Sequence, residues 1–288
     1  MSDQGLKILF VASEAEPFAR AGGLGSVMYS LPMAMKEIGF DARLMIPRYL
    51  NVDEKLYNLE MEVEGLKIPT SNTHGEHFLI CNVKKYTGQP QANTPVTTYF
   101  LENQEYYEQR ANIYGYSDDP IRWALLSRGV LEFLKVSSWV PDVIVCSDWQ
   151  TGYLPNYQKT LYREDPIISK IKVIFSIHNL SYQGTFRHRF VEGSDIDDGQ
   201  SRLPAFEDPR LMKINGMKRG IIYSDLVNTV SPTYAKEILT EGFGEGLQDL
   251  LASKPSGVSG IMNGIDYDLW NPKSDEMIKH PFSAKKLS

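Results

Sequence analysis

The chain has 288 residues, of which 42% are hydrophobic and 23% charged, an ordinary composition for a globular protein. Its formal net charge of −6 and its pI near 5.5 argue against non-specific binding of nucleic acid, because a polyanion would be repelled. No apolar run approaches the roughly 20 residues that a membrane-spanning helix needs. We therefore expect neither a nucleic acid nor a membrane as a partner.

The two cysteines, Cys81 and Cys146, each lie in an apolar, strand-like run. This setting predicts buried free thiols and offers neither a disulfide framework nor a metal cluster. The first residues are few and polar and lead directly into a strand, which predicts that no signal peptide precedes the fold. The expected location is the cytoplasm, and neither a metal nor a cofactor is expected.

The N-terminal segment predicts a β-strand, a glycine turn, a helix and a second strand. Residues 7–13 form a continuous apolar run, typical of a strand buried on both faces of a parallel sheet. Gly22-Gly23-Leu24-Gly25 lies in the turn, residues 27–38 have helical periodicity, and residues 42–47 form the next strand. This order, with glycines at the first crossover, predicts a Rossmann-like fold.

The rest of the chain predicts a β insertion followed by further strands and helices. Short alternating segments at 61–68, 77–83 and 96–101 predict a β-hairpin or meander at an edge. Buried strands are expected at 143–146, 173–177 and 226–229, and helices at 119–136, 151–161, 209–223 and 232–239. The expected fold class is α/β: a Rossmann-like, mostly parallel sheet with helices on both faces and a β-hairpin insertion at about residues 51–104.

Polar residues follow the ends of four predicted strands. These are Ser13-Glu14, Ser147-Asp148-Trp149, His178-Asn179 and Thr229-Val-Ser231. In open α/β sheets ligands bind outside the carboxyl ends of the strands, and right-handed crossovers bring those ends to one edge. Residues more than a hundred positions apart are therefore expected to converge on one crevice.

The loop Arg20-Ala-Gly-Gly-Leu-Gly25 has two interpretations that the sequence leaves open. Adjacent glycines let backbone N–H groups approach a phosphate or a sugar, and Arg20 and the following helix N-terminus add positive charge. Alternatively, the glycines serve a turn that needs positive φ. The loop does not match Gly-x-Gly-x-x-Gly, so a nucleotide-dependent oxidoreductase is disfavoured.

Asp148, Trp149 and His178 each have a structural alternative. Asp148 is either the N-cap of the next helix or a carboxylate that binds sugar hydroxyls. Trp149 is either part of the core or an apolar platform for a sugar. A lone histidine after a strand is usually structural, but further polar residues follow His178 closely and favour a functional role.

Taken together, these segments resemble the family of bacterial glycogen synthases and plant starch synthases, in the GT-B superfamily. The matching stretches run in order along the chain: Ile8–Pro17, Ala21–Leu24, Ile113–Gly115, Asp148-Trp149, Ile177–Gly184, Val230–Ile238 and Gly260–Pro272. The resemblance implies transfer of glucose from a nucleotide sugar, usually ADP-glucose, to the 4-hydroxyl at the non-reducing end of an α-1,4-glucan or maltooligosaccharide, with retention. It also implies that two Rossmann-like domains face a cleft and that the N-terminal one holds the acceptor.

The resemblance implies a role for individual residues as well. His178, Asp148 and Glu14 would form the catalytic centre; Arg20, Gly22, Gly23 and Asn263 would bind the donor; and Trp149, Asn179 and Tyr107 would bind the acceptor. Tyr106 is the alternative to Tyr107, because the spacing of that loop is shifted. Cations and aligned N–H dipoles would stabilise the leaving diphosphate, which would help to deprotonate the acceptor on the same face of the sugar.

Three stretches depart from the family pattern. Arg20 stands where the family has Lys, and Ser26 where it has Asp. Ser147-Asp-Trp-Gln150 stands where the family has His-Asp-Trp-His. Arginine is a planar fork and lysine a compact charge, so their exchange is not conservative beside a phosphate. These changes predict a divergent member with altered donor handling or reduced activity.

The expected domain organisation assigns residues 1–265 to the Rossmann-like, acceptor-side domain and residues 266–288 to the start of an interdomain linker. The family's C-terminal nucleotide-binding domain is expected to be absent from the chain, so the chain alone is expected to lack significant synthase activity. The alternative is a non-catalytic glucan-binding module derived from a synthase domain. The changes at 20, 26, 147 and 150 favour the module, whereas the retained glycines and strand-end residues favour the enzyme.

Overall fold

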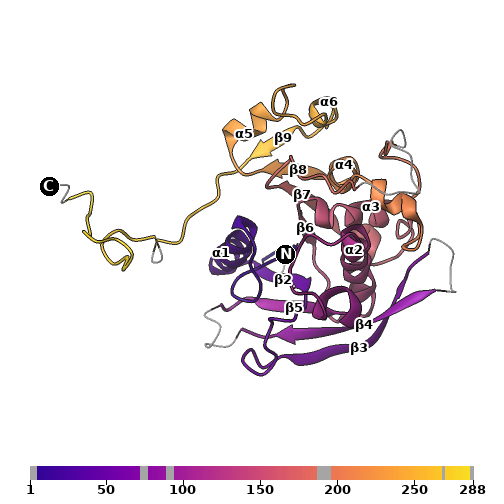
Figure 1. Ribbon diagram of the computed structural model, residues 1–288, viewed down its shortest axis with the longest axis horizontal. Helices are drawn as coiled ribbons and strands as arrows, with labels where there is room; N and C mark the ends of the chain where they lie inside the picture. The colour runs from indigo at the N-terminus through magenta and orange to yellow at the C-terminus, as the bar shows by residue number, and fades with distance from the viewer. Residues whose placement is uncertain (1–4, 72–76, 89–93, 187–195, 268–269, 286–288) are drawn as a thin grey trace.

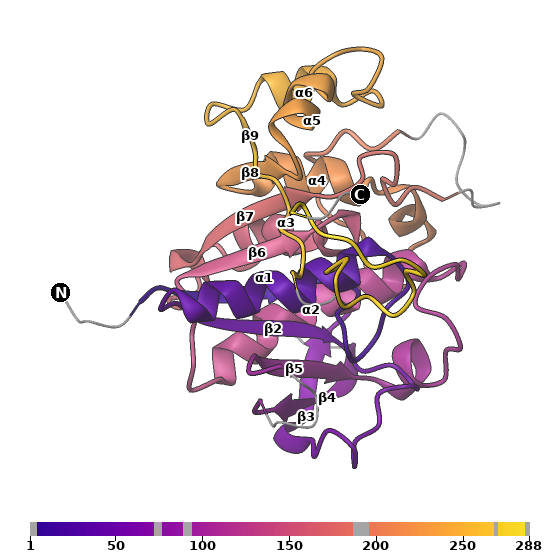
Figure 2. The same cartoon turned by 90° about the vertical axis from the view of Figure 1, so that its left-hand side faces the viewer.

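The computed structural model describes residues 5–71, 77–88, 94–186, 196–267 and 270–285 (Figure 1). Within these residues, nine strands form one sheet in the order β3-β4-β5-β2-β1-β6-β7-β8-β9 (Figure 2). The strands are β1 Lys7–Val11, β2 Asp41–Pro47, β3 Glu60–Pro69, β4 Phe78–Tyr86, β5 Thr97–Glu102, β6 Val143–Ser147, β7 Lys172–Ile177, β8 Leu226–Thr229 and β9 Val258–Gly260.

The centre of the sheet consists of apolar strands that are buried on both faces. In β1 the side chains of Leu9, Phe10 and Val11 are at most 1% exposed. β1 pairs in parallel with β2 on one side and with β6 on the other, which is the setting that such continuous apolar runs favour. The predicted Rossmann-like, mostly parallel sheet is confirmed. Cys81 in β4 and Cys146 in β6 are buried free thiols, also as predicted.

Helices cover both faces of the sheet, as predicted. They are α1 Gly23–Glu37, α2 Asp119–Val136, α3 Tyr153–Thr160, α4 Gly216–Tyr223, α5 Pro232–Glu237 and α6 Gln248–Ala252. In Figure 1, α1 lies on one side of the strands, and α2, α3 and α4 lie on the other, where α3 packs between α2 and α4. None of the helices in the described part of the chain is both long and apolar enough to cross a membrane.

Two helical regions differ from the sequence prediction. α1 begins at Gly23 rather than at residue 27, so Gly22 is its N-cap and the glycine loop runs directly into its first turn. The expected helix 209–223 is a 3-10 turn, Pro209–Lys213, followed by α4. Asn215 separates the two because its side chain accepts a hydrogen bond from Lys218 N and thereby starts a new helix.

The predicted β insertion is a three-stranded meander at one edge of the sheet. β3 pairs antiparallel with β4, and β4 pairs antiparallel with β5. β5 also pairs in parallel with β2, so the meander continues the main sheet rather than forming a separate layer. The edge position predicted from the alternating pattern is therefore correct for β3 and β4, whereas β5 is also a member of the parallel sheet.

The direction of the chain through the sheet reverses between β1 and β6. From β1 the chain proceeds to β2 on one side, and from β6 it proceeds through β7 and β8 to β9 on the other. All of these neighbouring pairs are parallel, so their carboxyl ends lie at one edge. Such a reversal is the position at which open α/β sheets bind ligands.

A buried ion pair fixes the loop that begins near residue 196 against α3 and α4. Arg219 in α4 is fully buried and donates through Nε (3.0 Å) and Nη2 (2.5 Å) to the carboxylate of Asp197. Its Nη1 also donates to the carbonyl oxygen of Ser201 at 2.6 Å and to Asn156 Oδ1 at 3.2 Å. The backbone of residues 197–201 is thus held in one position.

Beyond β9 the chain leaves the sheet and runs away from the body of the molecule (Figure 1). Large apolar side chains in this segment are exposed, including Ile265 (61%), Tyr267 (81%), Trp270 (65%) and Met277 (92%). The division at residue 265 and the linker at 266–288 stay predictions.

Candidate functional site

Three strand ends bring polar side chains together at the switch point between β1 and β6. Ser13 and Glu14 follow β1, Asp148 follows β6, and His178 and Asn179 follow β7. We call these five residues the strand-end site. The predicted convergence is thereby confirmed for three of the four strand ends. At the fourth, Ser231 accepts a hydrogen bond from Tyr234 N and caps α5.

Glu14 holds the glycine loop in place. Its carboxylate is 2% exposed, and Oε2 accepts hydrogen bonds from Ala21 N and, at 2.9 Å, from Gly22 N. These amides lie at the N-terminus of α1, where a negative charge is favourable. The next amide, Gly23 N–H, is exposed and has no acceptor among the described residues. The loop therefore uses the amides of Ala21 and Gly22 internally, whereas Gly23 N–H has no internal partner in the described part of the chain.

Tyr114 contacts the strand-end site, although the sequence analysis assigned it no role there. Its hydroxyl donates to Glu14 Oε1 at 3.1 Å and lies 2.7 Å from Ser13 Oγ. Burial raises the pKa of this phenol above its usual range, so the hydroxyl keeps its proton. The contact spans a hundred residues of sequence, so no local pattern indicates it.

Arg122 in α2 supports the loop that carries Tyr114. The guanidinium is fully buried; Nη1 donates to Ile113 O at 2.8 Å and to Asp119 Oδ1 at 2.6 Å, and Nε donates to Tyr106 O at 2.7 Å. These contacts fix the backbone on both sides of the loop. The position of Tyr114 against Glu14 thus depends on a charge inside the helix layer.

Asp148 joins the end of β6 to the end of β7. Its Oδ1 accepts hydrogen bonds from His178 N at 2.7 Å and from Asn179 N at 3.1 Å, and it makes no side-chain cap bond to the helical turn that follows. Asp148 thus stands at the N-cap position of the 3-10 turn Trp149–Thr151, but its side chain does not cap that turn. The backbone of Asp148 has φ 57° and ψ −178°, a conformation that residues other than glycine rarely adopt. Strain of this kind is held by the surrounding bonds and occurs mostly at functional sites.

The charges at Asp148 and His178 are both disfavoured by burial. Burial raises the pKa of Asp148 against the lowering effects of His178 and its backbone amide, and the nearby charge of Glu14 raises it further. Burial also lowers the pKa of His178 below its ordinary value of 6.5, although the charge of Asp148 opposes this. Nε2 of His178 lies 3.2 Å from Ser176 Oγ. The imidazole is thus neutral near pH 7 and able to donate or accept one hydrogen bond.

Trp149 lies beneath a hollow next to the strand-end site. The indole is 6% exposed and makes aromatic contacts with Trp123 and Phe186, so it belongs mainly to the core. Trp149 and residues 181–186 line a hollow of about 300 Å³. Gly184 has φ +83°, and a Cβ there would lie 2.1 Å from the indole, so only glycine fits over this ring.

The choice of Tyr107 as an acceptor contact is not supported. Tyr107 is fully buried, and its hydroxyl donates to Arg122 O at 2.7 Å. A π-helical turn, Gln104–Glu108, directs this side chain into the core, which the shifted spacing of the loop does not predict. Tyr106 on the same turn is only partly buried.

Two of the residues expected to bind the sugar donor lie apart from the strand-end site. Arg20 is 54% exposed and forms an ion pair with Glu16. Asn263 is exposed in the segment beyond β9, and none of its hydrogen bonds reaches the strand-end site as the structure describes it. No group of three or more His, Cys, Asp or Glu side chains that could hold a metal ion occurs among the described residues.

The fold of this chain matches that of a solved structure. The catalytic domain of starch synthase IV from Arabidopsis thaliana, bound to ADP and acarbose, matches with a TM-score of 0.78 and 30% sequence identity. The match covers 99% of this chain and 57% of that one. The fold is therefore that of a GT-B glycosyltransferase domain.

Sequence comparison identifies the family. Residues 7–253 match the family model described as starch synthase catalytic domain. The chain is 39% identical over 285 residues to a glycogen synthase of Clostridium perfringens, and 36% identical over 288 residues to one of Clostridium kluyveri. The matches cover 98% of this chain but 56% and 57% of those relatives, so the chain spans about half the length of the curated relatives it matches. The chain belongs to the starch synthase catalytic domain family.

Replacing Tyr114 with Phe removes two hydrogen bonds from Ser13 and Glu14. We expect the free energy of unfolding to fall by about 1–2 kcal/mol and amide exchange at Ala21 and Gly22 to accelerate, because the Glu14 carboxylate loses a partner. Urea unfolding and hydrogen exchange measure the two effects. Tyr116→Phe, in the same loop, is the matched control, because the Tyr116 hydroxyl accepts a hydrogen bond from Asn112 N and has no other hydrogen-bond partner among the described residues. Equal exchange at Ala21 and Gly22 in both variants would show that Tyr114 does not help Glu14 to hold the glycine loop.

The lowered pKa of His178 predicts loss of stability on acidification. The unfolded chain takes up the proton near pH 6.5, whereas the folded state resists it, so stability decreases as the pH falls below that value. Between about pH 7.5 and about pH 5.5, His178→Gln should lose less unfolding free energy than the parent chain, by up to about 1 kcal/mol. Exposed His280→Gln should follow the parent chain; a His178→Gln profile that also follows it would refute the assignment.

Proposed function

We propose that the strand-end site binds the non-reducing end of an α-1,4-glucan and takes part in glucosyl transfer to it from a nucleotide-glucose, ADP-glucose in the first instance, with retention. The observation that carries the proposal is the pair of carboxylates at the switch point, one fixing the glycine loop and the other fixing the segment with His178 and Asn179. The family supports it, as does the neighbour that was solved with ADP and acarbose. The chain spans about half the length of its curated relatives, so we propose the transfer for a protein that also supplies the rest of their length.

Asp148 and His178 are suited to orienting a sugar. Asp148 uses Oδ1 for two backbone amides, and Oδ2 has no hydrogen-bond partner among the described residues, so it is available to a hydroxyl group. A neutral His178 adds a hydrogen bond without placing a second positive charge beside an oxocarbenium-like transition state. Asn179 is exposed next to them and adds an amide. We propose that these three groups hold the sugar at the reaction centre.

Glu14 acts, in this proposal, as a positioning residue instead of the catalytic residue expected from the resemblance. Both of its oxygens are occupied, one by loop amides and the other by Tyr114. The fixed loop presents Gly23 N–H and the positive end of α1 to the donor diphosphate, so these dipoles need no reorganisation during the reaction. Departure of the diphosphate is thereby stabilised by backbone dipoles.

Breaking the ion pair between Arg20 and Glu16 costs little free energy, so Arg20 is available to the sugar donor. Arg20 is exposed and Glu16 is partly buried, and ion pairs near the surface contribute about 0–1 kcal/mol. Arg20 is thus able to leave Glu16 for a diphosphate. The replacement of Lys by Arg then changes the geometry of the contact rather than removing it.

The alternative function, a non-catalytic glucan-binding module, draws on the departures from the family pattern. Two of these departures carry little weight, because Ser147 is fully buried and Gln150 is 9% exposed, so both alter the core below the site. The departures at Arg20 and Ser26 concern the donor side. A module would bind maltooligosaccharide, and ADP-glucose would not increase that binding.

The location we propose is the cytoplasm, where the free thiols of Cys81 and Cys146 stay reduced.

Calorimetric titration of maltotetraose into the chain and its Asp148→Asn variant tests the proposal. Asparagine keeps an oxygen acceptor for His178 N and Asn179 N but loses the charge that Oδ2 presents to a hydroxyl. We expect glucan affinity to fall at least about tenfold, because charge-assisted hydrogen bonds are roughly twice as strong as neutral ones. The free energy of unfolding should stay equal or rise by about 1 kcal/mol. The pKa of Asp148 is raised in the folded state, so ionisation of this carboxyl destabilises the folded chain as the pH rises, and asparagine removes that cost.

Asp142→Asn is the matched control for this experiment. Asp142 precedes β6 at the opposite edge of the sheet, where its carboxylate accepts a hydrogen bond from Lys7 N. This variant should bind maltotetraose as the parent chain does. Unchanged binding by Asp148→Asn, or equal loss in both variants, would refute the placement of the acceptor at the strand-end site.

A further inference from the structure

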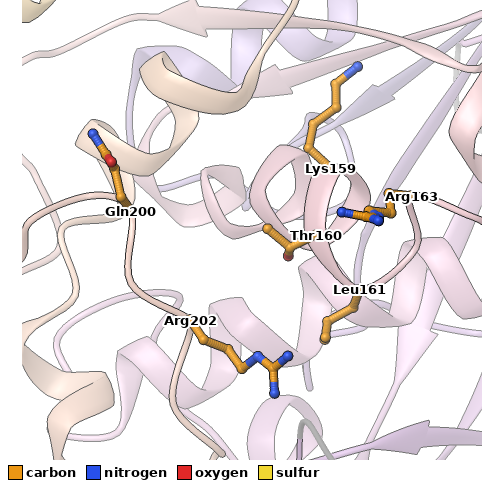
Figure 3. A pocket seen from close by; sticks show the side chains of 6 residues that line it. All are labelled: Lys159, Thr160, Leu161, Arg163, Gln200 and Arg202. Carbon is orange, nitrogen blue, oxygen red and sulfur yellow. The ribbon is translucent and has the colours of Figure 1, made fainter.

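A second hollow lies at the edge of the sheet opposite the strand-end site. It measures about 380 Å³ and is lined by Lys159, Thr160, Leu161, Arg163, Gln200 and Arg202 (Figure 3). α3 starts near the carboxyl end of β6 and runs back, so its last residues lie beside Asp225, which precedes β8. The hollow is therefore separated from the strand-end site by the length of α3.

The lining of this hollow is cationic. Three of its six residues are Lys or Arg and none is acidic, although the whole chain carries a formal net charge of −6. Arg202 forms no ion pair with any described residue, and Arg163 pairs only with the adjacent Glu164, both side chains being at least 70% exposed. Such an exposed pair competes weakly with a ligand. Two guanidinium groups are thus available in one hollow.

A structural explanation accounts for Lys159 but not for the two arginines. Lys159 lies in the last turn of α3, where a cation is favourable at the negative end of the helix, and its Nζ lies 3.1 Å from Asp225 Oδ1. In Figure 3 its amine points away from the guanidinium groups of Arg163 and Arg202, which lie on either side of Thr160 and Leu161. Arg202 comes from a different segment of the chain, so the end of α3 does not explain it.

The segment that carries Arg202 is fixed before any ligand binds. Ser201 O accepts from the buried Arg219, and the neighbouring Leu203 is 3% exposed. On the other side of Ser201, the carbonyl oxygen of Gln200 accepts from Tyr223 Oη at 3.4 Å. The guanidinium of Arg202 therefore extends from a rigid backbone, which lowers the entropy lost on binding.

We propose that this hollow is a binding site for a small phosphorylated sugar. Guanidinium groups match the geometry of phosphate oxygens, and Arg163 and Arg202, from separate segments, line the same hollow. The Gln200 amide supplies neutral hydrogen bonds for sugar hydroxyls, the Thr160 hydroxyl, which donates to Asn156 O, is able to accept one, and Leu161 supplies an apolar contact. The volume falls in the range of known small-molecule sites. The site binds independently of the glucan at the opposite edge.

Calorimetric titration with glucose 1-phosphate, inorganic phosphate and glucose tests this proposal. We expect saturable binding of both phosphate-containing probes, tighter binding of glucose 1-phosphate than of phosphate, and no binding of neutral glucose at this hollow. Arg163→Ala combined with Arg202→Ala should weaken both affinities at least about tenfold, because it removes the charge-assisted bonds. Both arginines are exposed, so the double variant should keep the thermal stability of the parent chain.

Lys170→Ala is the control for charge alone. Lys170 is exposed near the same edge but does not line the hollow. This variant should bind glucose 1-phosphate within about twofold of the parent chain, since only a screened surface charge changes. Tighter binding of free phosphate than of glucose 1-phosphate would show that the sugar makes no favourable contact, and would overturn the proposal that the ligand is a phosphorylated sugar. Equal affinities in the double variant and the parent chain would show that the anion binds elsewhere, the glycine loop included, and would overturn the proposal.

Discussion

The carboxylate of Glu14, held by the amides of Ala21 and Gly22, is the contact on which the rest of the site depends. It places a buried negative charge at the positive end of α1, where the helix dipole stabilises it. It also ties the end of β1 to the start of the helix that follows, so the glycine loop has one conformation. Tyr114 extends the same contact to the loop between β5 and α2. Segments far apart in sequence thus behave as one rigid surface.

Asp148 performs the same task for the next two strands, at a higher conformational cost. Its backbone adopts a conformation that is unfavourable by about 1–3 kcal/mol for a residue with a side chain. Two amides from the end of β7 hold it there. Both carboxylates therefore satisfy backbone donors and face the switch point together. In the function that we propose, this site orients neutral hydroxyl groups, and Gly23 N–H with the N-terminus of α1 stabilises the leaving diphosphate.

The sequence predicted the sheet and the location of the site better than the contacts within it. Buried strands such as β1 are specified by continuous apolar runs, and parallel pairing then brings Glu14, Asp148 and His178 to one edge. The early start of α1 was missed because its N-cap, Gly22, has no capping side chain and the loop before it is held by Glu14 rather than by a local pattern. Tyr114 was missed because its partners lie a hundred residues away. The burial of Tyr107 was not predicted because a π-helical turn sets which tyrosine enters the core.

Hydrogen exchange of the chain with and without saturating maltotetraose tests most directly whether the switch point holds the glucan. Peptides that contain Glu14 and the glycine loop, Asp148, and His178 with the following residues 179–184 should exchange more slowly when the sugar is bound. Peptides from the end of α3 and from the segment of Arg202 should be unaffected, because they lie at the opposite edge. Protection confined to that opposite edge or to the β3–β4 hairpin, with none at the three strand ends, would contradict the placement of the acceptor at the strand-end site.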